Sequence, residues 1–154
     1  MDFNYYMREA LKEANRALLN GEVPIGAVIV HNGVIIGRGA NNVENSKYAY
    51  EHAEIIAIKE ASDFIGDWRL EDAIMFTTLE PCAMCAGAIL NSRIKTVVVG
   101  ASNDKCGFAG SMMNLFDYNI SNHKVELISG ILSDECSKII NDFFRKRRIE
   151  NGGI

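Results

Sequence analysis

Two short segments of the chain hold the residues whose types and spacing could carry chemistry. The first contains His52 and Glu54, and the second contains Cys82 and Cys85. Zinc binds imidazole nitrogen and thiolate sulfur tetrahedrally, and a catalytic zinc site leaves one of its four positions open for water. His52, Cys82 and Cys85 would supply three ligands. Glu54 would then be a free carboxylate able to transfer protons between that water and a substrate.

The spacing of the two cysteines fits the start of a helix. Cys82 and Cys85 are three residues apart, so their sulfurs would share one face of a first helical turn opened by Pro81. A helix N-terminus lowers thiol pKa values and so favours the thiolates that bind metal. Zinc lowers the pKa of water towards about 7. Glu54 is assigned to proton transfer because a carboxylate held by the metal would do this poorly.

A structural zinc site is the competing interpretation. Such a site normally has four protein ligands, and the candidates for a fourth are Cys106, Cys136, His31 and His123. None of them forms a second paired motif, and Cys136 is expected to be an ordinary buried helix residue. The order His-x-Glu followed by Pro-Cys-x-x-Cys is the known signature of zinc deaminases that act on cytosine or adenine. We therefore expect one catalytic Zn2+ per subunit.

The chain as a whole is expected to be one domain spanning residues 1–154. It is 48% hydrophobic and 23% charged, an ordinary globular composition. With 16 basic and 20 acidic residues its net charge is −4, which argues against a surface built for general nucleic-acid binding. No apolar run approaches the roughly 20 residues of a membrane helix. The acidic start, Met1-Asp2-Phe3-Asn4, is unlike a signal peptide, so we expect a cytoplasmic protein.

Hydrophobic periodicity predicts alternating strands and helices. Asn32-Gly33 is a strong hairpin signal, and Asp2 and Ser133 are candidate helix caps. Residues 40–51 are expected to form a surface loop that delivers His52, and residues 101–122 to be irregular. The expected helices are 3–20, 52–64, 81–90 and one starting at Ser133, and the expected strands are 27–30, 34–39, 73–79, 96–100 and 124–128. This pattern predicts an α/β fold, a three-layer α/β/α sandwich with a mixed five-stranded sheet and helices on both faces.

The last helix combines an apolar stripe with a basic end. Ile139, Ile140, Phe143 and Phe144 form the stripe, and Arg145-Lys146-Arg147-Arg148 follow it. A cationic helix end is usually a solvated terminus that complements the helix dipole. Arginine and aromatic side chains also suit unstacked RNA bases. The residues alone leave both interpretations open.

The sequence closely resembles the bacterial tRNA-specific adenosine deaminases, of the cytidine deaminase-like superfamily, over nearly its whole length. The zinc motif would fit any enzyme of that superfamily, whereas the matches after residue 110 narrow the resemblance to this branch. The resemblance implies a homodimer that converts adenosine to inosine at the wobble position of a tRNA anticodon stem-loop. The matching stretches are Gly21–Val28, His52–Ile55, Thr78–Ala88, Ser92–Ile94, Gly110–Leu115, Asn122–Val125 and Asp142–Arg148.

The resemblance also implies roles for individual residues. His52, Cys82 and Cys85 would be the zinc ligands. Glu54 would be the proton shuttle. The substrate-binding residues would be Asn41 at the flipped nucleotide, Asn122 in the anticodon pocket, and Phe144, Arg147 and Arg148 on the helix that meets the anticodon loop.

Three sites depart from the family pattern, and one of them, Ala40 in place of a larger residue, is expected to have no consequence. Tyr48-Ala49-Tyr50-Glu51 stands beside the pocket where the family usually has Asp-Pro-Thr-Ala, and Asn103 stands where aspartate is common. Loss of the charge at Asn103 is expected to ease the approach of a nucleotide backbone and to loosen discrimination of RNA over DNA.

Two other functions compete with this reading. A deaminase of a free nucleobase or nucleoside, of the guanine or cytosine type, uses the same zinc chemistry but needs a closed pocket and no basic tail, so Arg145–Arg148 argue against it. A non-catalytic, zinc-stabilised RNA-binding subunit would have no use for Glu54 beside an open metal position.

Overall fold

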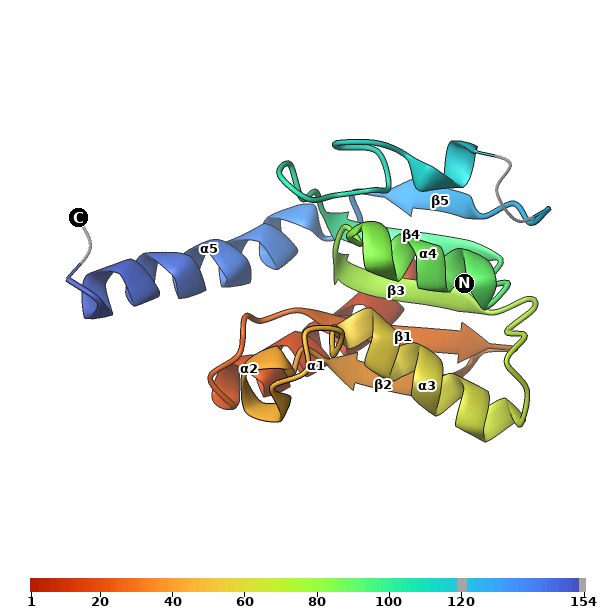
Figure 1. Ribbon diagram of the computed structural model, residues 1–154, viewed down its shortest axis with the longest axis horizontal. Coiled ribbons are helices and arrows are strands. Elements are labelled where there is room, and N and C mark those ends of the chain that lie inside the picture. The colour runs from red at the N-terminus through yellow and green to blue at the C-terminus, as the bar shows by residue number, and fades with distance from the viewer. Residues whose placement is uncertain (119–121, 153–154) are drawn as a thin grey trace.

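A five-stranded mixed sheet forms the centre of the molecule, in a computed structural model that describes residues 1–118 and 122–152. Its strand order is β2-β1-β3-β4-β5 (Figure 1). β1 runs antiparallel to both β2 and β3, whereas β3, β4 and β5 run parallel. The strands are β1 (Gly26–His31), β2 (Val34–Ala40), β3 (Ile74–Leu79), β4 (Thr96–Ala101) and β5 (Glu126–Ser129).

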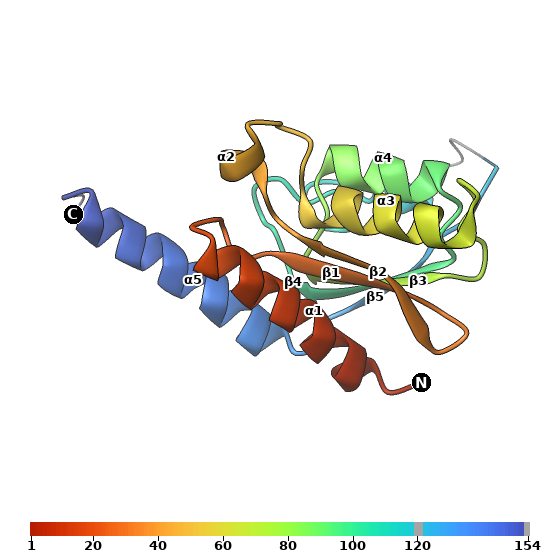
Figure 2. The same cartoon turned by 90° about the horizontal axis from the view of Figure 1, so that it is seen from below.

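Helices cover both faces of this sheet, as Figure 2 shows. α1 (Phe3–Leu19) and α5 (Ser133–Glu150) lie on one face, and α3 (Ala53–Ile65) and α4 (Ala83–Asn91) lie on the other. The predicted three-layer α/β/α sandwich is therefore confirmed. No helix in the described ranges is both long and apolar enough to cross a membrane.

The central strands β1, β3 and β4 are buried on both faces, because helices cover each face of the sheet. Alternate residues of each strand enter different halves of the core. Ala27 and Ile29 of β1 pack beneath α3 and α4, while Val28 and Val30 pack beneath α1 and α5. Cys136 lies in the second half and is fully buried, which confirms its expected core role.

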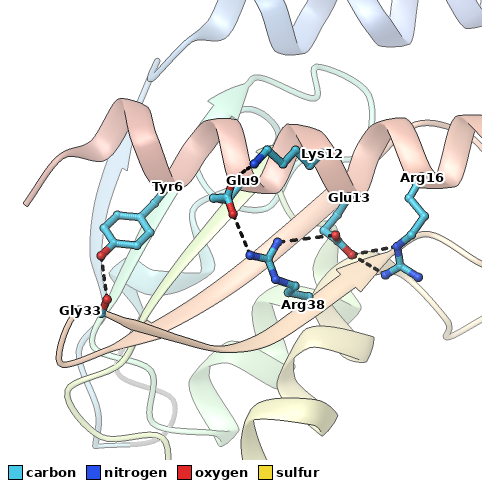
Figure 3. Close-up of polar contacts among 7 residues, drawn as sticks. All are labelled: Tyr6, Glu9, Lys12, Glu13, Arg16, Gly33 and Arg38. Atoms are coloured by element: carbon cyan, nitrogen blue, oxygen red, sulfur yellow. Dashed lines mark hydrogen bonds and ion pairs between the residues drawn. The ribbon is translucent and has the colours of Figure 1, made fainter.

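Close packing and ion pairs hold α1 against the sheet. A side chain at Gly26 would put its Cβ 2.1 Å from the carbonyl oxygen of Ala10, so only glycine lets the helix lie this near β1. Glu9 and Glu13 are buried on the sheet side of α1, and both pair with Arg38 of β2 (Figure 3). Paired in this way, the two carboxylates can be withdrawn from water.

The structure corrects four local predictions. The loop predicted at 40–51 contains a short helix, α2 (Val43–Ser46), because the buried carboxylate of Glu22 accepts hydrogen bonds from the Glu44 and Asn45 N–H groups. α4 begins at Ala83, with Cys82 as its N-cap, so Pro81 precedes the helix. Ser133 is the first residue of α5, whose N-cap is Leu132. The last strand is displaced to Glu126–Ser129.

Two other local predictions are confirmed. The Asp2 side chain accepts a hydrogen bond from the Tyr5 N–H and caps α1. The two residues of the Asn32-Gly33 turn both have positive φ between β1 and β2, as a hairpin turn of this kind requires. Of the stretch predicted to be irregular, residues 119–121 lie outside the described part of the chain.

Candidate metal centre and substrate cavity

Two helix starts converge at the end of the sheet where β3 finishes. His52 is the N-cap of α3, and Cys82 is the N-cap of α4, with Cys85 in the first turn of that helix. Figure 1 shows both helices beginning at this end of the molecule. Cys82 and Cys85 thus face His52 from one short segment, as their spacing predicts.

The three side chains are placed as zinc ligands should be. His52 Nδ1 lies 3.6 Å from Cys82 Sγ and 3.5 Å from Cys85 Sγ. All three donor atoms lie within 4.8 Å of one another. Tetrahedral zinc with usual bond lengths would separate a nitrogen and a sulfur ligand by about 3.5 Å. The donor set and its spacing therefore fit a zinc ion bound through Nδ1 and two sulfurs.

No fourth protein ligand joins this group within residues 1–118 and 122–152. Cys136 is a buried residue of α5, on the other face of the sheet. His123 instead places its Nε2 2.7 Å from the carbonyl oxygen of Ile94. Three protein ligands would fit a catalytic zinc site, whereas a structural zinc site normally has four.

The electrostatics of the metal-free cluster favour one thiolate. Hydrogen bonds from Cys85 and His52 lower the pKa of Cys82 to about 4, against the desolvation of its half-buried sulfur. The pKa of Cys85 is raised, because its thiol hydrogen-bonds the Cys82 sulfur and is itself buried. The pKa of His52 is raised by its hydrogen bond to Cys82. Cys82 is therefore a thiolate beside His52 in neutral solution, and the thiolate is the form of sulfur that binds a metal ion.

Glu54 lies in the first turn of α3 and is buried. Burial raises the pKa of its carboxyl group to about 7. A group with this pKa exchanges protons readily at neutral pH, which suits general acid and base catalysis. Glu54 is not part of the ligand cluster, so metal ligation would not occupy its oxygens.

A cavity of about 250 Å³ opens beside these residues. Asn41 is buried in its wall and donates its Nδ2 to the carbonyl oxygen of Val23 at 3.3 Å, and its Oδ1 has no hydrogen-bond partner among the described residues. A buried unpaired acceptor costs free energy unless a ligand satisfies it. Asn41 Oδ1 is therefore ready to accept a hydrogen bond from a bound molecule. The cavity is lined by Glu22, Val23, Ile25, Asn41, Val43, Glu44, His52, Ala53 and Glu54.

A larger groove of about 700 Å³ shares Val23 and Ile25 with the cavity. Phe144, 43% exposed, and Arg148 form its α5 side, and residues 102–106 form the opposite side. Arg147 lies elsewhere. Its guanidinium group is 5.0 Å from the centre of the Phe143 ring, and its Nη2 donates to the Gly21 carbonyl oxygen at 3.4 Å. Of the basic residues predicted to bind substrate, only Arg148 lines this groove.

Comparisons with known proteins agree with this geometry. The family model described as MafB19-like deaminase matches residues 1–148. A tRNA-specific adenosine deaminase of Bacillus subtilis (strain 168) is 49% identical, over 93% of this chain and 89% of that protein. This chain belongs to the tRNA-specific adenosine deaminase family.

Two solved structures of deaminases are similar in fold to this chain. The structure from a study of A-to-I editing by tRNA:A34 deaminases at the wobble position of transfer RNA has a TM-score of 0.84 and 38% identity, covering 88% of this chain and 98% of that one. A guanine deaminase from Bacillus subtilis has a TM-score of 0.65 and 31% identity, covering 95% of each chain. Both likenesses extend over the whole sandwich, and the first is the stronger.

One residue expected in the substrate pocket of this deaminase lies far from it. Asn122 is exposed and precedes β5. Because β5 runs parallel to β4 and β3, it begins at the end of the sheet opposite to the one where β3 leads into Cys82 (Figure 1). A single chain therefore does not bring Asn122 to the metal centre.

Two buried carboxylates near the site were missed by the sequence analysis. Glu22 has no exposed surface and Glu80 is 4% exposed. Each hydrogen-bonds a loop at the edge of the site. The sequence does mark both acids, because each has an apolar neighbour and stands one or two positions before a proline, as in Glu22-Val23-Pro24 and Leu79-Glu80-Pro81. An acid in such a setting is expected to turn inward only when backbone N–H groups can meet it.

Proposed function

We propose that this protein is a zinc-dependent tRNA adenosine deaminase that hydrolyses the wobble adenosine of a tRNA anticodon to inosine. The observation that carries the proposal is the cluster of His52, Cys82 and Cys85 at zinc-ligand spacing, with the buried carboxyl group of Glu54 beside a base-sized cavity. Hydrolysis replaces the exocyclic amino group by oxygen from water and releases ammonia. Bound zinc would supply a water of lowered pKa.

Glu54 carries the proton transfers in this proposal. Its carboxylate accepts a proton from the attacking water and delivers it to the ring nitrogen next to the reacting carbon. It then accepts the proton of the hydroxyl group now on that carbon and passes it to the departing amino group, which leaves as ammonia. The raised pKa of Glu54, about 7, keeps both protonation states accessible. Asn41 Oδ1 would accept a hydrogen bond from the nucleotide held in the cavity. Ala53 and Val43 give the cavity apolar walls that suit a base removed from its stack.

The groove beside the cavity is the proposed path of the anticodon loop. Phe144 offers an exposed ring for stacking an unpaired base, and Arg148 and Lys105 offer positive charge on opposite sides. These are the groups by which proteins bind single-stranded RNA loops. They supply locally the basic surface that the net charge of −4 does not provide overall.

We further propose that the working enzyme is a cytoplasmic homodimer of a single 1–154 domain. The position of Asn122 supports the dimer, since this residue could reach an anticodon pocket only on a second subunit. Exposed apolar side chains on the α3 and α4 side of the sheet also support it, among them Phe64, Trp68 and Met84. Large exposed apolar side chains of this kind are typical of surfaces that meet a partner.

The test is deamination by zinc-loaded protein of an anticodon stem-loop with adenosine at the wobble position, beside free adenosine, adenine, guanine and cytidine. Inosine is expected in the stem-loop alone, and the same stem-loop with guanosine at that position is the control. Turnover of free guanine would favour the activity of the solved guanine deaminase. Absence of turnover on every substrate in zinc-replete protein would favour a non-catalytic RNA-binding subunit.

A further inference from the structure

Two loops that frame the site are each held by one buried carboxylate. Glu22 accepts hydrogen bonds from the Glu44 N–H at 3.1 Å, from the Asn45 N–H at 2.8 Å and from the Asn45 side chain at 2.6 Å. All these donors belong to α2. The oxygens of Glu22 are therefore engaged by the loop, although the residue itself borders the cavity.

Glu80 does the same for the loop after β4. It accepts hydrogen bonds from the N–H groups of Asn103 at 3.1 Å, Ala109 at 3.0 Å and Ser111 at 2.9 Å, and also from the Ser111 hydroxyl. The loop closes tightly around the carboxylate. A Cβ on Gly107 would lie 2.3 Å from the carboxyl carbon of Glu80.

Neither carboxylate forms an ion pair within the described ranges. Their charge is stabilised mainly by N–H and O–H donors. Charge-assisted hydrogen bonds of this kind are about twice as strong as neutral ones and fix the donors in space. One buried side chain therefore accepts several of the hydrogen bonds that position each loop.

The two loops border different parts of the site. Val43 and Glu44, beside the Glu22 carboxylate, form a wall of the cavity that also contains His52 and Glu54. Residues 103–106, beside the Glu80 carboxylate, form the wall of the groove opposite Phe144 and Arg148. In the proposed complex, the loop held by Glu22 would contact the reacting base. The loop held by Glu80 would contact the nucleotides on either side of that base.

We propose that Glu22 and Glu80 are positioning residues with separate tasks. Glu22 holds the cavity wall that orients the base for deamination, and Glu80 holds the groove wall that binds the flanking nucleotides. This division rests on the proposed function. Neither side chain touches the reacting atoms, so each acts only through its loop.

The experiment uses zinc-loaded full-length protein and the anticodon stem-loop under single-turnover conditions with enzyme in excess. Glu22→Gln and Glu80→Gln each turn one acceptor oxygen into an NH2 group that faces N–H donors. Glu22→Gln is expected to lower the maximal rate about tenfold and to leave the half-saturating enzyme concentration within twofold. Glu80→Gln is expected to raise that concentration about tenfold and to leave the maximal rate within threefold. Each variant is the control for the other.

Milder variants keep the test open if either glutamine variant folds poorly. Asn45→Ala and Ser111→Ala each remove one side-chain donor and leave the backbone donors in place, so they are expected to show the same split at about two- to threefold. The proposal would be overturned if the maximal rate and the half-saturating enzyme concentration changed by the same factor in both pairs of variants. It would also be overturned if the loss of activity only followed the fall in melting temperature. An inactive wild-type protein would count against the proposed function instead.

Discussion

His52 Nδ1 lies 3.5 Å from Cys85 Sγ, although the two residues are 33 positions apart and stand at the starts of different helices. The contact exists because β3 brings the chain back to the end of the sheet where the loop after β2 leads into His52. It joins two separate motifs into one cluster that could hold a metal ion. The cluster leads to a prediction about the protein stripped of metal.

Cys82 should be a reactive thiolate in metal-free protein. Its pKa is lowered to about 4, whereas the pKa of buried Cys136 is raised to about 12. Iodoacetamide at about pH 6 is therefore expected to alkylate Cys82 and to spare Cys85 and Cys136, because the thiolate is the nucleophile. Peptide mass spectrometry gives the site, and zinc should protect it. Labelling that zinc leaves unchanged would show that the cluster does not bind the ion.

Glu54→Gln should abolish most of the activity without loss of zinc. General acid and base groups contribute about 10²- to 10⁴-fold to rate, and glutamine cannot exchange a proton. The maximal rate on the stem-loop should fall by that factor, and metal analysis should still find one zinc per chain. Glu60→Gln, at an exposed position on the same helix, is the matched control. Full activity of the Glu54 variant would mean that another group moves the protons.

Arg148→Ala should weaken RNA binding more than Arg145→Ala. Arg148 lines the groove, whereas Arg145 Nη2 lies 2.7 Å from Asp142 Oδ1 and its charge is already paired. Loss of one phosphate contact is expected to raise Kd about fivefold and to reduce the slope of log Kd against log salt by about 0.7. Fluorescence anisotropy at several salt concentrations measures both quantities. Equal effects of the two alanines would remove Arg148 from the RNA path.

Asn103→Asp should sharpen discrimination of RNA over DNA. Asn103 Oδ1 accepts a hydrogen bond from the Cys106 N–H at 3.3 Å, and aspartate can accept the same bond, so the loop should keep its shape. The new negative charge in the groove would oppose any nucleotide backbone. RNA retains contacts through its 2′-hydroxyl groups that DNA lacks. Rates on matched RNA and DNA hairpins give the ratio, and an unchanged ratio would refute the idea.

Arg38→Met should destabilise the fold by about 2 kcal/mol. It would leave Glu9 paired with Lys12 alone and Glu13 paired with Arg16 alone, without the guanidinium group that bridges α1 to β2. Loss of one partner from a buried carboxylate is costly. Urea unfolding measures the change. Arg69→Ala, which breaks an exposed pair with Asp67, is expected to cost less than about 0.5 kcal/mol.

The cost of Arg38→Met should depend on pH. Hydrogen bonds from Lys12 and Arg38 hold the pKa of Glu9 below its usual value of 4.5. A lowered folded-state pKa contributes stability above the unfolded value, and this contribution is lost as the pH falls through the folded value. The difference between wild type and variant should therefore shrink from about pH 6 to about pH 3. A constant difference would assign the loss to packing.

The sequence by itself determined the chemistry and the architecture of this protein. The types and spacing of His52, Glu54, Cys82 and Cys85 predict a zinc deaminase site, and the hydrophobic periodicity predicts the five strands and the four long helices around them. Both inferences are local, since ligand identity and amphipathic pattern depend on residues close together in the chain.

Tertiary structure decided what depends on distant partners. α2 could not be predicted, because its four residues are held by Glu22, about 20 positions earlier. The unpaired Oδ1 of Asn41, the placing of Arg148 but not Arg147 in the groove, and the remoteness of Asn122 also became visible only when the sheet had assembled. A hydrogen bond between segments far apart leaves no periodicity in the sequence, so the folded chain alone shows which groups meet.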